Sequence, residues 1–284
     1  MSVVYLVRTS LNAKHFRCVG SKGQFRTTKT FIETYLFIPM GGQKEARQGL
    51  EAERALIDYF NRDKEGLRKC LSEIDVIPPS SFTVVKPERR VKCDLMLRGD
   101  FTVCISLKAV KDASFHQLDR RWLDEWRGVL NMPQEVYNAI WEGIMRKARD
   151  PRAVFIDPKH WKVVGEFFRA NLPKILREIF TRDEEDLKVL AVWDRRGNEL
   201  CLFNMDEVIS FLSSQPVQFS DDGIIKIGEF VSIQRKGGDG SHVKKPKTDP
   251  THPGNQLQFK FKPLEFMRSA KGLLKSCCVA PAKT

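Results

Sequence analysis

The sequence predicts a mixed α/β (α+β) fold in which helices flank a central mixed β-sheet. Segments with the two-residue alternation of strands are interspersed with segments of helical periodicity, without a steady strand–helix–strand rhythm. A hydrophobic content of 42% in 284 residues is sufficient for a substantial core. Two β-rich runs flank the turn Arg98-Gly99-Asp100 and predict a hairpin over 91–108.

The other elements follow in order along the chain. Before the hairpin, the sequence predicts short β segments within irregular structure over 1–43, helices over 43–61 and 66–77, and a strand over 81–85. After the hairpin, Ser114 is expected to cap a helix over 115–126, followed by helices over 132–148, 158–170 and 171–181, strands over 187–193 and 199–203, and a helix over 205–213. The C-terminal part predicts a β-hairpin: a strand over 224–236, a glycine turn, a basic loop over 241–254 and a strand over 255–262. We expect one domain over 1–265 and a flexible tail over 266–284.

The predicted hairpin carries the most informative pair of residues. Asp94 lies near the start of its first strand and is expected to face Lys108 at the end of the second. In the second strand, Cys104, Ser106 and Lys108 share one face because strand side chains alternate. A carboxylate beside an amine at the end of two core strands can hold a divalent cation and a water near a phosphodiester. A surface salt bridge is the alternative interpretation.

Glu53 is the second candidate in the N-terminal half. It lies on the same predicted helical stripe as Leu50, Ile57 and Phe60. A carboxylate on a core-facing stripe is costly unless it is paired or binds a cation. An ion pair with an arginine at the edge of the core and a functional role both remain open at this point.

Charge is distributed unevenly along the chain. Residues 231–284 carry 11 Lys and Arg against 3 Asp and Glu, whereas residues 1–230 carry 37 against 33. A basic C-terminal segment on a nearly balanced body favours contact with a polyanion, most often nucleic acid. In the strand over 255–262, Leu257, Phe259 and Phe261 are expected to point to one side and the polar residues to the other.

The seven cysteines form no CxxC pair. Their number and scattered spacing favour free thiols in a reducing cytoplasm, with Cys93 and Cys104 as small core residues and Cys277-Cys278 in a disordered end. No signal peptide and no apolar run of membrane-spanning length is visible, so we expect a cytoplasmic protein without membrane contact.

The order of these elements resembles the PD-(D/E)xK nuclease superfamily, especially Type II restriction endonucleases. The match consists of a helix with Glu53, a strand with Asp94, a turn, and a strand ending Ser106-Leu107-Lys108. The resemblance implies that Asp94 is the first metal ligand, that Glu53 assists it from the helix, and that Lys108 places the attacking water. Ser106 stands where the acidic ligand is usual, a departure that Mg²⁺ tolerates because it keeps several waters in its shell.

The resemblance extends to the C-terminal segment. Gln234-Arg235-Lys236-Gly237-Gly238, followed by Gln256-Leu257-Gln258-Phe259-Lys260, is similar to the C-terminal pattern of several restriction enzymes. Arg235, Gln256 and Gln258 are therefore expected to read bases, while Lys236, Lys260 and Lys262 contact phosphates. Gln234 is expected to bind DNA beside them. Gln117, Arg120 and Arg121 are expected to meet a phosphate from the start of the helix over 115–126.

The resemblance implies a sequence-specific endonuclease that hydrolyses double-stranded DNA with Mg²⁺. It places the catalytic core at about 43–130 and the DNA-recognition segment at about 224–263. It also implies a cognate DNA methyltransferase as genetic partner, and it leaves monomer and homodimer open. A repair-type nuclease is one alternative, although the Arg121 that follows Gln117 departs from its pattern. A catalytically inactive DNA-binding protein on a nuclease scaffold is another, which Ser106 permits; an RNA-binding module lacks the expected aromatic stacking strand.

Overall fold

The computed structural model describes residues 41–88, 92–111, 115–182, 184–238 and 243–281, with side chains from Arg47 onward. The chain divides into two compact units, Met1–Arg47 and Gln48–Thr284. Of the first unit only the start of helix α1 (Gly41–Arg62) is described. The short β segments expected before residue 41, Cys18 and the Ser114 cap lie outside the described residues.

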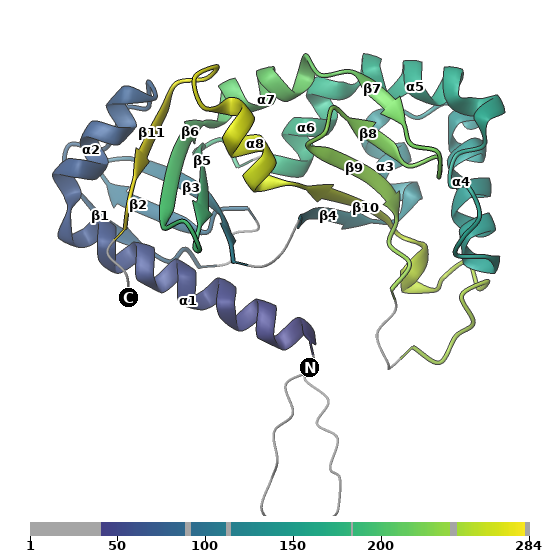
Figure 1. Ribbon diagram of the computed structural model, residues 1–284, viewed down its shortest axis with the longest axis horizontal. Helices are drawn as coiled ribbons and strands as arrows, with labels where there is room; N and C mark the ends of the chain where they lie inside the picture. The colour runs from purple at the N-terminus through teal and green to yellow at the C-terminus, as the bar shows by residue number, and fades with distance from the viewer. Residues whose placement is uncertain (1–40, 89–91, 112–114, 183, 239–242, 282–284) are drawn as a thin grey trace, which may run out of the picture. The chain divides into compact units, whose positions relative to one another are not determined.

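The second unit contains a six-stranded and a five-stranded sheet (Figure 1). The first, sheet A, has the order β1 (Phe82–Val85), β2 (Leu95–Gly99), β3 (Thr102–Val110), β5 (Leu187–Asp194), β6 (Glu199–Asn204) and β11 (Ser276–Val279). The pair β3 and β5 is parallel and the other neighbours are antiparallel, so the expected mixed sheet is confirmed. Sheet B is antiparallel throughout, in the order β4 (His116–Arg121), β10 (Leu257–Phe261), β9 (Val231–Arg235), β8 (Ile225–Ile227) and β7 (Val217–Phe219).

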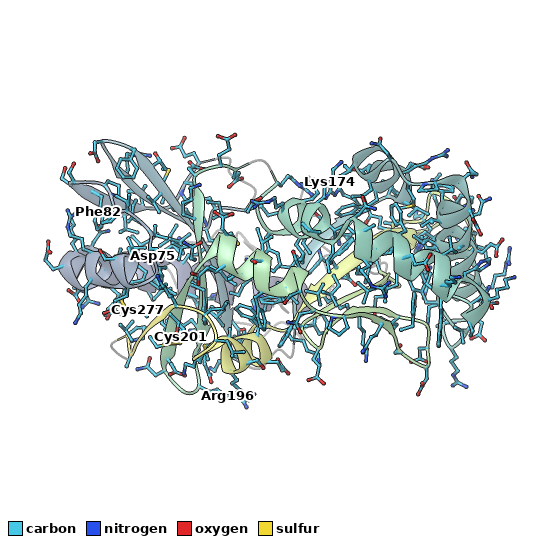
Figure 2. The ribbon with its side chains drawn as sticks, turned by 90° about the horizontal axis from the view of Figure 1, so that it is seen from above. Asp75, Phe82, Lys174, Arg196, Cys201 and Cys277 are labelled. Atoms are coloured by element: carbon cyan, nitrogen blue, oxygen red, sulfur yellow. A yellow bond between two sulfur atoms is a disulfide. The ribbon has the colours of Figure 1, made fainter. Side chains whose placement is uncertain are left out.

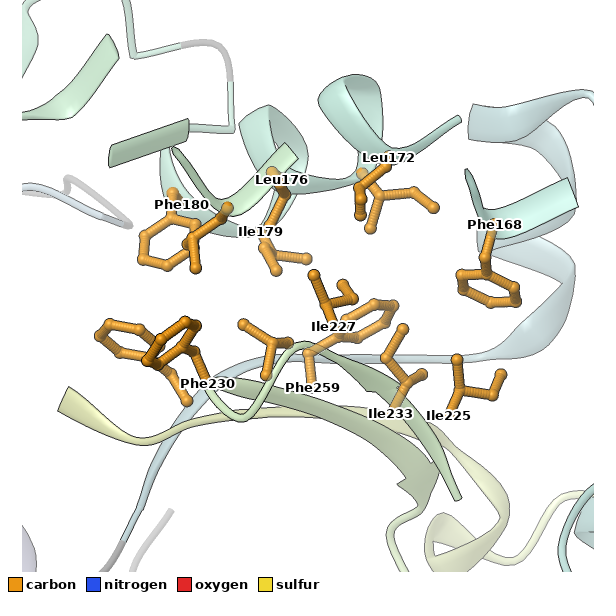
Figure 3. Packing of buried hydrophobic residues seen from close by; sticks show 14 of the residues in the cluster. Phe168, Leu172, Leu176, Ile179, Phe180, Ile225, Ile227, Phe230, Ile233 and Phe259 are labelled. Carbon is orange, nitrogen blue, oxygen red and sulfur yellow. The ribbon is translucent and has the colours of Figure 1, made fainter. Parts of the chain in front are cut away.

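Helices cover these sheets and enclose two hydrophobic cores. The helices after α1 are α2 (Lys64–Glu73), α3 (Leu123–Leu130), α4 (Gln134–Arg149), α5 (Trp161–Ala170), α6 (Leu172–Phe180), α7 (Met205–Ser213) and α8 (Pro263–Ala270), with short 3₁₀ turns at Pro158–His160 and Pro253–Asn255. The smaller core lies between α1, α2 and one face of sheet A. The larger core joins the other face of sheet A to sheet B and the remaining helices. Figure 3 shows part of it, where Phe168, Leu176 and Ile179 of α5 and α6 pack over Ile225, Ile233 and Phe259.

The helix with Glu53 turns a different stripe to the core than its sequence predicted. Ala52, Leu56 and Phe60 are buried at four-residue spacing against sheet A. Leu50 is 44% exposed, and Glu53 lies at the edge of the buried stripe. The buried stripe therefore differs by about one residue from the predicted one. The prediction followed the larger Leu50, whereas the small Ala52 packs against the sheet.

Residues 116–121 form a strand, so the helix predicted over 115–126 is wrong in its first half. Phe115, Leu118 and Trp122 recur at helical spacing, but β4 pairs along its length with β10, a partner about 140 positions later in the chain. Such long-range pairing overrides local preference. The helix begins only at Leu123. A bulge between the two pairing registers accounts for Leu118, which has no Cα partner on β10.

The strand predicted over 224–236 is two strands, β8 and β9, joined by a turn. Gly228 has a φ of +52°, which side-chain-bearing residues rarely adopt, and this glycine allows the reversal. The expected antiparallel partnership between the strand before the basic loop and the strand after it is confirmed as β9 and β10.

The predicted flexible tail is also wrong within the described residues, because α8 packs in the larger core and β11 forms an edge of sheet A. Three disulfides, Cys70–Cys277, Cys93–Cys104 and Cys201–Cys278, replace the expected free thiols. Two of them bind β11 to α2 and β6, at the end of the unit that also carries Asp75 (Figure 2). Sequence spacing could not reveal pairs that the sheet brings together from 77 and 207 positions apart. None of the described helices is long and apolar enough to cross a membrane.

Candidate active site

The hairpin of β2 and β3 brings Asp94 and Lys108 together as its sequence predicted. Leu95 pairs with Ile105, which places Asp94 beside Ser106, and the Asp94 amide donates to the Ile105 carbonyl at 2.9 Å. The Lys108 ammonium lies 3.6 Å from Asp94 Oδ2. Their side chains are 15% and 31% exposed, so the pair is partly shielded from water yet reachable from it.

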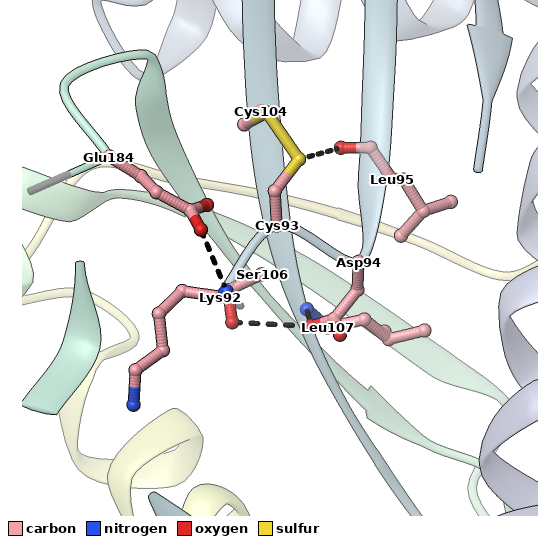
Figure 4. Close-up of a disulfide and its surroundings, with 8 residues drawn as sticks. All are labelled: Lys92, Cys93, Asp94, Leu95, Cys104, Ser106, Leu107 and Glu184. Atoms are coloured by element: carbon pink, nitrogen blue, oxygen red, sulfur yellow. Dashed lines mark hydrogen bonds between the residues drawn. A yellow bond between two sulfur atoms is a disulfide. The ribbon is translucent and has the colours of Figure 1, made fainter. Parts of the chain in front are cut away.

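The Asp94 carboxylate is held in place by the opposite strand. Its Oδ2 accepts a hydrogen bond from the Leu107 amide at 2.6 Å and from the Ser106 hydroxyl at 3.3 Å (Figure 4). Lys108 donates to Ser106 Oγ at 2.7 Å and to the Leu107 carbonyl at 3.2 Å. Ser106 therefore lies between the carboxylate and the amine and contacts both.

A pocket of about 340 Å³ opens beside this trio. Residues of β3, β4 and α6, and of the segment just before β2, line it: Lys92, Asp94, Ser106, Lys108, Gln117, Leu118, Asp119, Arg120, Ile179, Phe180 and Arg182. Four of these side chains are basic and two are acidic. Such a pocket favours an anionic ligand, as a phosphodiester would be.

Asp119 is the second aspartate of this pocket and was missed in the sequence. Its side chain is fully buried and is surrounded by cations. Arg121 binds both carboxylate oxygens at 3.0 and 3.1 Å, Arg182 donates at 2.7 Å, and Lys92 Nζ lies 3.7 Å away. Because 116–121 is a strand, the two-residue alternation places Asp119 and Arg121 on the same, inner face. The helix predicted for this segment concealed that pairing.

Two further side chains of the site have displaced pKa values. Burial lowers the pKa of Lys92 to about 8, with Asp119 opposing and Lys108 adding to the shift. The Lys92 ammonium donates to the carbonyls of Leu118 at 2.7 Å and Ile179 at 2.6 Å, which ties the start of the hairpin to β4 and α6. Burial also lowers the pKa of His116 to about 4, and the Lys108 ammonium acts in the same direction. His116 is therefore neutral at pH 7.

Glu53 does not join this pocket. Its carboxylate lies 2.5 Å from Lys86 Nζ, so Glu53 forms an ion pair, but with a lysine in place of the expected arginine. Asp119 cannot replace it as a ligand, because three cations already occupy its oxygens. Among the described residues, the one close group of three ligating side chains is Glu199, Cys201 and Cys278 on β6 and β11, and its two sulfurs are bonded to each other.

Asp94 and Ser106 nevertheless fit a hard cation of the Mg²⁺ type. Mg²⁺ is commonly bound by one or two carboxylates, with substrate phosphates and waters completing its octahedral shell. Asp94 offers a charged oxygen and Ser106 a neutral one, and the open pocket beside them leaves room for phosphate and water.

The expected DNA-contacting residues divide into two groups. Arg235 is 5% exposed and donates to Asn255 Oδ1 at 2.9 Å, and Arg121 binds Asp119, Glu178 and the Trp126 ring. Arg235 is therefore not placed to read a base, and Arg121 is not placed to meet a phosphate. Gln117, Arg120 and Arg121 belong to a strand rather than to a helix N-terminus. The alternation of Val231, Ile233 and Arg235 already indicated that Arg235 faces the core.

The second group is more exposed, with the exception of Gln258. Gln117 is exposed, and Gln234, Lys236, Gln256 and Lys260 are half-buried. Gln258 is 8% exposed and its amide donates to Gln117 Oε1 at 2.7 Å. Lys260 lies over the Phe115 ring at 4.2 Å, and burial lowers its pKa.

Comparison with known proteins yields a structural similarity but no sequence relative. No protein-family model matches the chain, and no curated protein matches it. Among solved structures, it is similar to the restriction endonuclease MspI in complex with its cognate DNA, at 12% sequence identity and a TM-score of 0.43. The similarity covers 73% of this chain and 83% of that one.

Proposed function

We propose that this chain is a Mg²⁺-dependent endonuclease that hydrolyses phosphodiester bonds of double-stranded DNA at specific sites. The observation that carries the proposal is the contact of Asp94, Ser106 and Lys108 at the mouth of a basic pocket. A lone surface ion pair would not need a backbone amide and a hydroxyl to orient its carboxylate. The sequence resemblance of the same three residues to the PD-(D/E)xK nucleases supports the same conclusion.

The reaction requires water to attack phosphorus while the bond from phosphorus to the leaving oxygen breaks. A Mg²⁺ ion bound by Asp94 would polarise the phosphate and lower the pKa of the attacking water. Lys108 would donate a hydrogen bond to the phosphorane, where negative charge increases during the attack. The hydrogen bonds from Ser106 and Leu107 keep the Asp94 carboxylate fixed, so little reorganisation is needed when substrate arrives.

A second candidate function follows from Ser106. The site has one carboxylate where two are usual, so a DNA-binding protein that has lost cleavage is the alternative. It would bind DNA with similar strength with and without Mg²⁺ and would leave the strands intact. If the enzyme is active in its host, we expect a methyltransferase that protects the same sites. The proposal is compatible with action as a monomer and as a homodimer.

The test is incubation of the full chain with unmethylated phage DNA, in Mg²⁺ and in EDTA, followed by electrophoresis. We expect discrete fragments that require Mg²⁺. The matched control is Asp94→Asn, which keeps the size of the side chain and removes its charge. Loss of several kcal/mol of transition-state stabilisation should slow this variant by roughly a thousandfold. A Mg²⁺-dependent smear would indicate a nuclease without site specificity. Intact DNA with the wild-type chain, or equal cutting by Asp94→Asn, would contradict the proposal.

A further inference from the structure

One face of sheet B consists of polar and basic side chains. The register of the strands aligns them in two rows: Arg120, Gln258 and Gln234 in one, and Gln117, Lys260, Ser232, Lys226 and Gln218 in the other. The alternate residues, such as Ile225, Ile233 and Phe259, point to the opposite side and pack under α5 and α6 (Figure 3). In the described strands this face carries three basic residues and no carboxylate, which suits a polyanion.

This face is continuous with the candidate active site. Gln117 and Arg120 line the pocket that contains Asp94 and Lys108, and both belong to β4. β4 is the edge strand of sheet B, with β10 beside it. A nucleic acid that placed a phosphodiester at Asp94 would therefore meet the β4–β10 edge next. The major groove of B-DNA is about 12 Å wide and admits a two-stranded ribbon whose strands lie about 5 Å apart.

The side chains at this edge offer hydrogen-bond donors. The side-chain amide of Gln258 donates to Gln117 Oε1. The exposed side-chain NH₂ group of Gln117 can therefore donate a hydrogen bond outward. Arg120 is exposed and its guanidinium has only donors. Guanine presents two acceptors, N7 and O6, at its major-groove edge, and no other base presents this pair.

We propose that the β4–β10 edge reads guanine in the major groove next to the cleaved phosphodiester. Arg120 is the specificity-determining side chain, and Gln117, oriented by Gln258, is its neighbour in recognition. Lys226 lies further out on the same face and would contact a phosphate. This inference rests on the proposed function, because it takes duplex DNA as the ligand.

Arg120, which the sequence predicted as a phosphate contact, takes the base-reading role that the sequence assigned to Arg235. Arg235 and Arg121 are on the inner face of sheet B, where Asn255 and Asp119 bind them. Arg120 points to the opposite face from Arg121 because the two are neighbours on one strand. Arg120 is thus the arginine of this edge whose side chain is exposed.

The test selects bound sequences from a library of random DNA duplexes, with the full chain carrying Asp94→Asn so that no cleavage occurs. We expect enriched duplexes to share at least one guanine. Adding Arg120→Ala should lower the preference for guanine at one position by roughly 10- to 100-fold, the value of one bidentate base contact. The matched control is Arg268→Ala, which removes an exposed arginine from α8 and should leave the preference unchanged.

A chemical probe then identifies the atom that is read. In the selected duplex, 7-deazaguanine removes the N7 acceptor and leaves base pairing intact. Binding should weaken about tenfold with Arg120 present and change little in Arg120→Ala, because the two changes remove the same contact. If Arg120→Ala keeps the full guanine preference, or if no sequence is enriched, the inference is wrong. Discrete Mg²⁺-dependent fragments from the wild-type chain would still support the endonuclease if Arg120→Ala keeps the guanine preference, so the two proposals fail separately. The absence of any enriched sequence would also contradict cleavage at specific sites.

Discussion

Asp94 and Asp119 line the same pocket from different sheets, and each lies near a lysine. Asp94, just before β2, is 31% exposed and has one cation at 3.6 Å, one amide and one hydroxyl around it. Asp119, on β4, is fully buried and contacts two arginines and a lysine within 3.7 Å. A buried carboxylate whose oxygens are all engaged stabilises a structure but cannot take a new ligand. A half-exposed carboxylate with a single loose ion pair can.

The number of cationic partners thus distinguishes an aspartate that is available for catalysis, Asp94, from one that stabilises the fold, Asp119. Both belong to a polar cluster in one pocket, and residue type alone does not distinguish them. The cations around Asp119 also serve the site indirectly. Lys92 and Arg182 connect β4 to the hairpin and to the end of α6, so the charge network holds the two sheets at the positions where Asp94 and the face of sheet B meet.

The largest effect on stability is expected for Asp119→Asn. The change removes the acidic partner of Lys92 and Arg182 and one of the two acidic partners of Arg121, which keeps Glu178. Breaking a buried pair in this way typically costs about 3–5 kcal/mol. Denaturant unfolding measured beside Asp94→Asn would test the comparison. Asp94→Asn should lose less than about 1 kcal/mol, as is usual for a more exposed pair. Equal losses for the two variants would show that the aspartates are not distinct.

Lys108→Met comes next and addresses activity. Its ammonium should stabilise the charge on the phosphorane, and removing one such donor typically slows a reaction by roughly 10²–10³-fold. Single-turnover cleavage with saturating enzyme measures this step directly. The thermal unfolding midpoint provides the control, since the aliphatic stem of Met fills most of the same volume. A large drop in stability with an unchanged rate would make Lys108 structural, like the cations around Asp119.

Glu53→Gln is expected to have the smallest effect. Its partner Lys86 is 52% exposed, and pairs of this kind contribute about 0–1 kcal/mol. The Mg²⁺ concentration that supports half-maximal cleavage should not change, because Glu53 does not line the pocket of Asp94. A severalfold increase in the required Mg²⁺ would restore Glu53 as a carboxylate of the metal site and reduce the contrast between α1 and the hairpin.

The sequence predicted what is local in this molecule. Asp94, Ser106 and Lys108 lie within one hairpin, so strand alternation and a two-strand register were enough to place them together. The same alternation, applied to Val231, Ile233 and Arg235, would have assigned Arg235 to the core. The prediction that Arg235 reads a base rested instead on the basic and amide residues around it.

What the sequence could not predict depends on distant partners. The strand at 116–121 exists because β10 pairs with it, and its own residues have helical spacing. The role of Asp119 follows from that strand and from Arg182, which lies 63 positions away. The cysteine pairs likewise follow from the place of β11 in sheet A. In each case a contact with large sequence separation decides between local alternatives that are close in energy.

The position of β11 has a consequence for the synthesis of this protein. Sheet A begins with β1 at residue 82 and gains its last strand only at 276–279, after all of sheet B has been made. Until residues 276–279 have been translated, the edge of β6 therefore has no partner strand. Cys70 and Cys201 likewise cannot form their disulfides before Cys277 and Cys278 are present. An unpaired edge is a template for pairing with other chains. The chain is thus open to misassociation at this edge until β11 pairs with β6.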